Sequence, residues 1–200
     1  MRGASRVSSA ALGDQLAAED ITSATVATRL GNELFSVVGL LDSEHGLRRA
    51  LADPGKPAAE KGAVAGALLH GKVTQRTEAL VVAAVESHWA RLGDMVDAIE
   101  ELAVSAMVLA ADTDNSLDDL EDVLFRFSRV VSAQPDLRAA LADPGLPEDR
   151  KHDLVGALLD GKVSAVTLGL INQVIAHPRG RPLSEQRFRM RTGEEFFGSF

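Results

Sequence analysis

The stretch "LRRALADPGKPAAEKGAVAGALLHGKV" at residues 47–73 recurs ninety residues later as "LRAALADPGLPEDRKHDLVGALLDGKV" at residues 137–163. Position by position, 17 of the 27 residues are identical. Each copy opens with a short helical pattern that Asp-Pro-Gly ends. Pro disfavours the helical conformation in the residue before it, and Gly permits the chain to reverse. The segment therefore predicts two short helices joined by a turn, used twice.

The second helix of each copy has its own start and stop signals. Pro57 and Pro147 stand at its start, where a missing backbone N–H is harmless. Gly71 and Gly161 follow its last apolar residues and can end it in the left-handed conformation. The repeat is therefore a helix–turn–helix–turn cassette and an internal duplication.

Helical periodicity extends outward from both copies. Apolar residues recur in steps of three and four, whereas the alternation typical of strands is almost absent. The clearest runs are Val26, Leu30, Leu34, Val38 and Leu41, and Leu117, Leu120, Leu124, Phe127 and Val131. We expect helices over residues 3–18, 23–42, 45–52, 58–70, 74–91, 92–111, 117–132, 135–142, 148–160 and 164–177.

These helices predict an all-α fold, a tandem duplicated helical bundle with an irregular C-terminal tail. The first bundle is expected over residues 1–110 and the second over 92–181, so that the helix at 92–111 can serve both. After Arg181 the composition changes. The tail at 182–200 shows no sustained helical stripe, which suggests either a disordered segment or a departure from the proper reading frame.

Composition limits the possible functions. Hydrophobic residues make up 46% of the chain, and the absence of Cys excludes disulfides, zinc–thiolate sites and cysteine nucleophiles. The net charge of −8 opposes binding to nucleic acid. Six acids and no base lie between Asp112 and Asp122, a pattern typical of a solvated loop and the first turn of a helix. A spanning helix needs about 20 apolar residues, so runs such as 103–111 predict no direct membrane insertion.

The sequences "GALLHGK" and "GALLDGK" match part of a nucleotide-binding loop, G-x-x-x-x-G-K-[ST]. Val follows Lys72 and Lys162, so the hydroxyl that would hold magnesium is missing. The preceding residues are helix formers rather than a buried strand, and Ala-Leu-Leu would continue a helix. We therefore interpret each motif as a helix end and expect no nucleotide cofactor.

Other catalytic patterns are equally weak. The five His include no pair spaced three or four residues apart, so no metal site is expected. Lys151, His152 and Asp153 are consecutive and point in different directions on a helix. Trp89 is interpreted as a packing residue.

Two hypotheses follow: an interaction protein whose bundles receive partner helices, or a helical enzyme or ligand-binding domain. The lack of a polar cluster favours the first, and no catalytic residue is predicted.

The repeated motif also carries a family resemblance. Leu-Arg-x-x-Leu-x-Asp-Pro, a Pro three residues on, a Lys, and Leu-Leu before a Gly resemble the delta subunit of F-type ATP synthases. The mitochondrial relative is the oligomycin-sensitivity-conferring protein. The stretches "RLGDMVDAIEELAVSA" (91–106), "LEDVLFRFSRVVSAQPDLRAALAD" (120–143) and "AHPRGRPLS" (176–184) are similar to the long delta subunits of actinobacteria. The resemblance runs from about Gly3 to Ser184.

This resemblance implies a non-catalytic stator subunit of a proton-translocating ATP synthase. In the family, the helical domain caps the catalytic F1 head by binding N-terminal helices of alpha subunits, and a C-terminal domain joins the b subunits of the peripheral stalk. The protein would then lie at the cytoplasmic face of the plasma membrane through the complex. The alternative is a helical protein–protein interaction scaffold unrelated to ATP synthase.

The resemblance also implies where the partner binds. Alpha-subunit helices pack against the first and fifth helices of a family bundle, here 3–18 and 74–91. Candidate contacts in this first groove are Val7, Ala11, Val81 and Val85, with packing inside the bundle as the alternative role. The helices 92–111 and 164–177 are the equivalents in the second copy.

The resemblance ends near "PRGR", where family members continue into a long helix and a small mixed α/β domain. We therefore expect this chain to lack the C-terminal domain, which makes a link to the b subunits doubtful.

Overall fold

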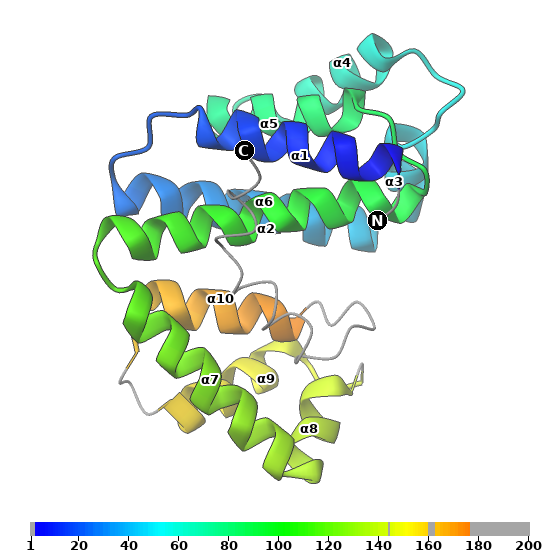
Figure 1. The fold of residues 1–200 in the computed structure, drawn as a ribbon. Coiled ribbons are helices and arrows are strands. Elements are labelled where there is room, and N and C mark those ends of the chain that lie inside the picture. Colours follow the sequence, from blue (N-terminus) through cyan, green and yellow to red (C-terminus); the bar gives the residue numbers. More distant parts are fainter. Residues whose placement is uncertain (1–2, 144, 160–162, 177–200) are drawn as a thin grey trace. The chain divides into compact units, whose positions relative to one another are not determined.

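The protein is all-α in the computed structural model, which describes residues 3–143, 145–159 and 163–176 (Figure 1). Ten helices and no strand lie in these ranges, which confirms the predicted fold class. The helices are α1 (Ala4–Ala17), α2 (Ala24–Ser43), α3 (His45–Leu51), α4 (Ala58–Leu69), α5 (Gln75–Glu86), α6 (Leu92–Thr113), α7 (Leu117–Ala133), α8 (Pro135–Ala142), α9 (Glu148–Leu159) and α10 (Ala165–Ala176). The irregular tail expected at 182–200 lies outside the described residues.

The chain divides into two compact units, Met1–Ala106 and Met107–Phe200, and the division falls inside α6. In the first unit α5 contacts α1, α2 and α4, and the short α3 contacts α2 and α4 (Figure 1). In the second unit α10 contacts α7 and α9, and α7 contacts α8. The expected domain limits, 1–110 and 92–181 with a shared helix, stay a prediction.

Residues ninety positions apart occupy matching places in the two cores. Pairs in which both members are 6% exposed or less include Leu30 and Leu120, Val37 and Phe127, Leu41 and Val131, and Leu51 and Leu141. The turn after the short helix also matches. Asp53 Oδ1 accepts a hydrogen bond from the Gly55 N–H at 2.8 Å, and Asp143 Oδ1 accepts one from Gly145 at 2.7 Å. The repeated sequence therefore builds the same turn and the same apolar stripe twice.

The end of α5 differs from the expectation. The helix stops at Glu86, and Ser87 is extended, whereas the apolar pattern predicted helix to residue 91. The early stop leaves the last carbonyls of α5 without the usual backbone donors. Trp89 is 7% exposed, and its indole Nε1 donates to the Ala84 carbonyl at 2.7 Å. The indole thus satisfies the helix end while its ring fills the core, consistent with the predicted packing role.

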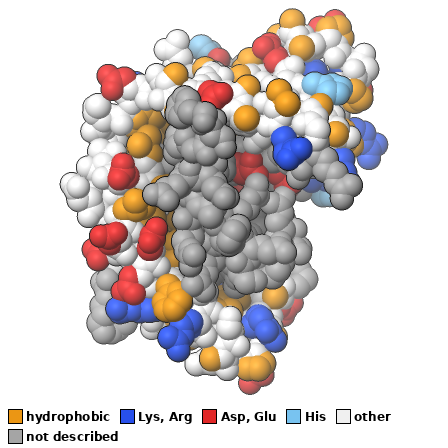
Figure 2. Space-filling model, in the orientation of Figure 1, with side chains coloured by type: hydrophobic (Ala, Val, Ile, Leu, Met, Phe, Trp, Pro, Cys, Tyr) orange, Lys and Arg blue, Asp and Glu red, His pale blue; other side chains and the backbone are white. Residues whose placement is uncertain are grey.

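The acidic run forms a short loop and the start of a helix, as expected. Helix α6 ends at Thr113, Asn115 adopts a left-handed φ of 58°, and α7 begins at Leu117. Asp118 and Asp119 lie in the first turn of α7, where they complement the positive end of the helix dipole. Figure 2 shows acidic side chains gathered over this connection.

Candidate functional site

Helices α1 and α5 lie side by side and antiparallel. At one end, Arg76 Nε is 2.8 Å from Glu19 Oε2, just after α1. At the other end, Ser8 Oγ donates to the His88 carbonyl at 2.8 Å, just after α5. The residue numbers in these pairs sum to 95 and 96. Because both helices rise equally per residue, Ala11 lies level with Ala84 and Val85, and Ala83 is one to two residues, about 1.5–3 Å, away along the axis.

The four predicted contact residues divide into two exposed and two buried. On α1, Val7 is 72% exposed and Ala11 is also exposed. On α5, Val81 and Val85 are 1% and 0% exposed, so a partner cannot reach them while the bundle is closed. Ile171, the equivalent of Val81, belongs to the core cluster of the second unit. Val81 of α5 and Ile171 of α10 therefore both point into their cores, where they bury apolar area.

Small residues of α5 reach the surface instead. Ala79 is exposed and Ala83 is half-buried, and both lie between the buried positions of the helix. Together with Val7 and Ala11 they form what we call the α1–α5 face. Ala79 and Ala83 are not among the predicted contacts, because residues 79–85 are all apolar and the pattern does not indicate which side faces outward. The useful signal is that alanines spaced four apart form a flat stripe that a second helix can approach closely.

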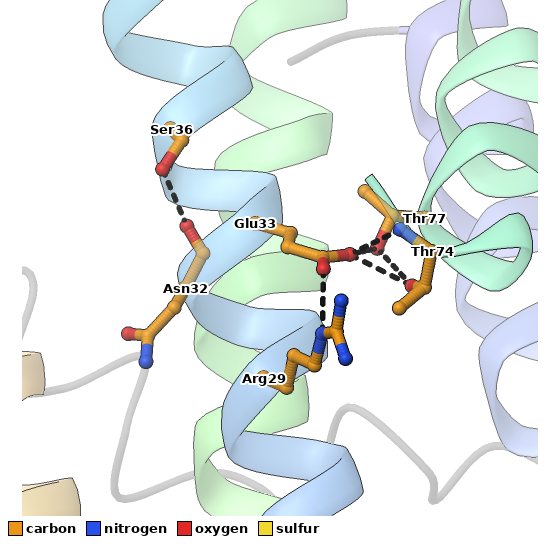
Figure 3. Close-up of polar contacts among 6 residues, drawn as sticks. All are labelled: Arg29, Asn32, Glu33, Ser36, Thr74 and Thr77. Atoms are coloured by element: carbon orange, nitrogen blue, oxygen red, sulfur yellow. Dashed lines mark hydrogen bonds and ion pairs between the residues drawn. The ribbon is translucent and has the colours of Figure 1, made fainter. Parts of the chain in front are cut away.

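The start of α5 is fastened to α2 by a carboxylate. Glu33 Oε2 accepts hydrogen bonds from the Thr74 N–H, the Thr74 hydroxyl and the Thr77 hydroxyl at 2.8, 2.7 and 2.6 Å (Figure 3). Arg29 Nε donates to Oε1 at 2.9 Å. Burial alone would raise the pKa of Glu33, but the hydrogen bonds from Thr77, Thr74 and Arg29 outweigh it and lower the pKa from 4.5 to about 2. This carboxylate therefore stays ionised and holds α5 beside α2.

The second unit keeps the hydroxyls of this arrangement and replaces the acid. Ser164 and Thr167 are the equivalents of Thr74 and Thr77, and their hydroxyl oxygens are 2.9 Å apart. Val123 stands where the first copy has Glu33, and it packs against the apolar cluster of the second unit. The start of α5 is thus bonded to a carboxylate of α2, whereas at the start of α10 the Ser164 hydroxyl accepts a hydrogen bond from the Thr167 N–H at 3.1 Å.

The segment that resembles a nucleotide-binding loop is a helix end. Gly66 to Leu69 form the last turn of α4, and Gly71 follows with a left-handed φ of 71°. The Lys72 N–H donates to the Leu69 carbonyl at 2.9 Å, so this backbone donor is used within the turn. A phosphate-binding loop needs its N–H groups turned toward the ligand. In the second copy, residues 160–162 lie outside the described part of the chain.

Titration of the chain with ATP and magnesium is expected to give no saturable binding at concentrations below about 1 mM. The reason is the helical backbone before Lys72 and the missing magnesium-binding hydroxyl after it. Isothermal titration calorimetry of the wild type and Lys72→Ala tests this. Saturable binding that Lys72→Ala abolishes would contradict the interpretation of this motif.

Neither a metal-binding cluster nor a membrane-spanning helix occurs in the described ranges. Within them, no three His, Cys, Asp or Glu side chains are grouped so that they could hold a metal ion. None of the helices in the same ranges combines the length and apolarity needed to cross a membrane. What the described geometry offers is a duplicated helical-bundle protein with an accessible helix-pair face.

Comparison with known proteins places this chain in a family. The family model of the ATP synthase delta (OSCP) subunit matches residues 103–190, which begin in α6 and include the second copy of the repeat. ATP synthase subunit delta of Thermobifida fusca is 43% identical over 185 residues, 92% of this chain and 68% of the relative. The Acidothermus cellulolyticus subunit is 39% identical over 188 residues, 92% of this chain and 69% of the relative. The Streptomyces avermitilis subunit is 43% identical over 182 residues, 90% and 66% of the two chains.

The chain belongs to the ATP synthase delta (OSCP) subunit family. The resemblance seen in the sequence is thereby confirmed. The chain spans about two thirds of the length of these relatives, 66–69% in the three cases.

Proposed function

We propose that this protein is a non-catalytic peripheral-stalk subunit of a proton-translocating ATP synthase, where it helps to keep the catalytic head from turning with the rotor. The observation that carries the proposal is the similarity to ATP synthase delta subunits across 92% of the chain. A scaffold unrelated to ATP synthase, the alternative from sequence, has no comparable support. The protein would be peripheral to the membrane, at its cytoplasmic face, and held there by the complex.

The proposed partner of the α1–α5 face is the N-terminal helix of an alpha subunit. An amphipathic helix laid against a helix pair is a recurring mode of recognition. Ala11 and Ala83 lie one to two residues, about 1.5–3 Å, apart along the helix pair, and their short side chains permit a close approach of a partner helix. Val7 adds an apolar side chain that is 72% exposed. Burial of this valine on binding is worth roughly 1–2 kcal/mol.

The b subunits are a second proposed partner. The family resemblance assigns this contact to sequence that follows the second helical bundle, and residues 177–200 lie outside the described part of the chain. The proposal for the head contact stands on α1 and α5 and does not depend on it.

A synthetic N-terminal helix of the cognate alpha subunit is expected to bind the full chain saturably. Ala11→Arg is expected to weaken this binding at least about tenfold, because the long charged side chain prevents the peptide helix from approaching the α1–α5 face closely. Fluorescence anisotropy of the labelled peptide measures the affinity. The number of sites, one or two, reports whether the second copy also binds.

Ala10→Arg is the matched control. Ala10 is exposed like Ala11 but lies about 100° further around α1. It adds the same charge to the same helix and should change the affinity by less than about threefold. Equal losses in both variants would mean that charge, rather than occlusion of this face, controls binding. Absence of any saturable binding to the folded wild type would overturn the proposed partner.

A further inference from the structure

The first two turns of α1 are held by hydroxyl groups rather than by apolar packing. The buried residues of α1 are Ser5, Leu12 and Leu16, so both buried apolar side chains belong to the second half of the helix. The first two turns, residues 4–11, carry Val7, which is 72% exposed, and the exposed Ala11. These turns therefore contribute the accessible part of the α1–α5 face while burying little apolar surface of their own.

Ser5 is the central contact of these two turns. It is 0% exposed, and its Oγ donates to Asp94 Oδ2 at 2.7 Å and accepts from the Ala90 N–H at 2.9 Å. Asp94 is 7% exposed and lies in the first turn of α6. Hydrogen bonds to a carboxylate are stronger than neutral ones, and they gain further strength away from water. One serine thus ties the start of α1 to the start of α6 and to the connection after α5.

Two more serines continue this attachment. Ser8 Oγ donates to the His88 carbonyl at 2.8 Å, and Ser9 Oγ donates to Glu101 Oε2 at 2.7 Å. Serine is a mediocre helix former, so its use at these three positions costs some helix propensity. These serines instead provide directional hydrogen bonds that fix the position of the first two turns. Segments with few buried apolar contacts open locally at low free energy unless such bonds hold them.

We propose that Ser5, through Asp94, is a positioning residue for partner binding: it keeps the first two turns of α1 in place so that Val7 and Ala11 meet the incoming helix already ordered. The inference rests on the proposed function. Loss of the bond lets these turns open, and the partner then binds only the fraction of molecules in which they are closed. Apparent affinity falls by that fraction, mainly through a slower association rate, because the contacts in the bound state are unchanged.

The test compares Ser5→Ala with the wild type in two measurements. Hydrogen exchange of the amides in residues 5–11 is expected to speed up about tenfold or more, while exchange in α2 and α5 stays unchanged. The alpha-subunit peptide is expected to bind Ser5→Ala several-fold more weakly, with a slower association rate and the same dissociation rate. Asp94→Asn, which keeps an acceptor without charge, should give an intermediate effect on both.

The controls separate positioning from general destabilisation. Ser36→Ala removes a bond to Asn32 within α2 and should change neither measurement. Ser9→Ala provides a half-buried second variant should Ser5→Ala fold poorly, and it should show the same pattern more weakly. Equal peptide binding by wild type and both serine variants would overturn the inference and leave the proposed function intact. No binding even by the wild type would instead overturn the proposed function, on which the inference depends.

Discussion

Phe35→Ala is expected to lower the free energy of unfolding of the first unit by about 3–4 kcal/mol, whereas Phe125→Ala is expected to cost the second unit less than about 1 kcal/mol. The two residues occupy equivalent places in the repeat, ninety positions apart. Phe35 is 3% exposed and Phe125 is 40% exposed. Removal of the buried Phe35 ring leaves a cavity in the core beside α2. Removal of the Phe125 ring loses less apolar burial, because water already reaches much of that ring. The Arg129 guanidinium, 5.7 Å from the Phe125 ring, adds little at an exposed site.

Urea denaturation measures both effects if each unit has its own probe. Trp89 is the only Trp in the chain, and it is buried in the first unit, so its fluorescence reports on that unit. Hydrogen exchange of α7 amides reports on the second. The Phe125→Ala variant serves as the matched control, and its Trp89 transition should coincide with that of the wild type. Similar losses for the two variants would mean that Phe125 is covered in solution and that the two copies are packed alike.

The contrast between these phenylalanines shows what the repeat could and could not predict. A 90-residue offset with the same apolar spacing was sufficient to predict two similar bundles, because helix formation and the main core stripe depend on local pattern. Whether a second face of the same helix, the one that carries Phe35 or Phe125, is also buried depends on the neighbouring helices. Gly31 and Val38 flank this face on α2, and Glu121 and Ser128 replace them on α7. Together with Arg129 in place of Gly39, these polar replacements indicate that the second face is less covered.

The candidate face was harder to predict than the fold. Residues 79–85 read Ala-Leu-Val-Val-Ala-Ala-Val, so all sides of this helix look apolar and the pattern cannot say which one points outward. Its orientation is set by contacts with residues distant in the chain, such as the hydrogen bond from Thr77 to Glu33. Ser5 and Asp94 are 89 positions apart, and neither stands out in its own helical stripe. Long-range polar pairs of this kind leave no periodic signal.

Glu33→Gln is expected to destabilise the first unit by roughly 2–3 kcal/mol at neutral pH. The side chain is 15% exposed, and hydrogen bonds from Thr77, Thr74 and Arg29, set against the opposing effect of burial, lower its pKa from 4.5 to about 2. The folded pKa lies below the unfolded one, so the stabilisation is fully present above about pH 4.5 and is lost as the pH falls toward 2. The difference between wild type and Glu33→Gln should therefore shrink across this range.

Denaturation followed by Trp89 fluorescence at pH 7, 5, 4 and 3 measures that difference. Because the other carboxylates titrate equally in both proteins, the difference isolates Glu33. A gap between the two proteins that stays constant from pH 7 to pH 3 would show that glutamine disturbs packing rather than removing a stabilising charge.

The duplication offers a further control within the same chain. Thr77→Val removes a hydroxyl that donates to an ionised carboxylate at 2.6 Å, whereas Thr167→Val removes one that is bonded to the Ser164 hydroxyl at 2.9 Å. Thr77 and Thr167 are 0% and 2% exposed, so burial does not distinguish them. Hydrogen bonds to charged groups contribute about 1.5–3 kcal/mol and neutral ones about 0.5–1.5 kcal/mol, so Thr77→Val should be the more damaging. The loss of stability caused by Thr77→Val should also become smaller as the pH is lowered and Glu33 becomes protonated, while the loss caused by Thr167→Val should not change. If the two substitutions cost the same stability at every pH, the buried threonines themselves would provide the stabilisation. Glu33 would then not be what holds α5 beside α2.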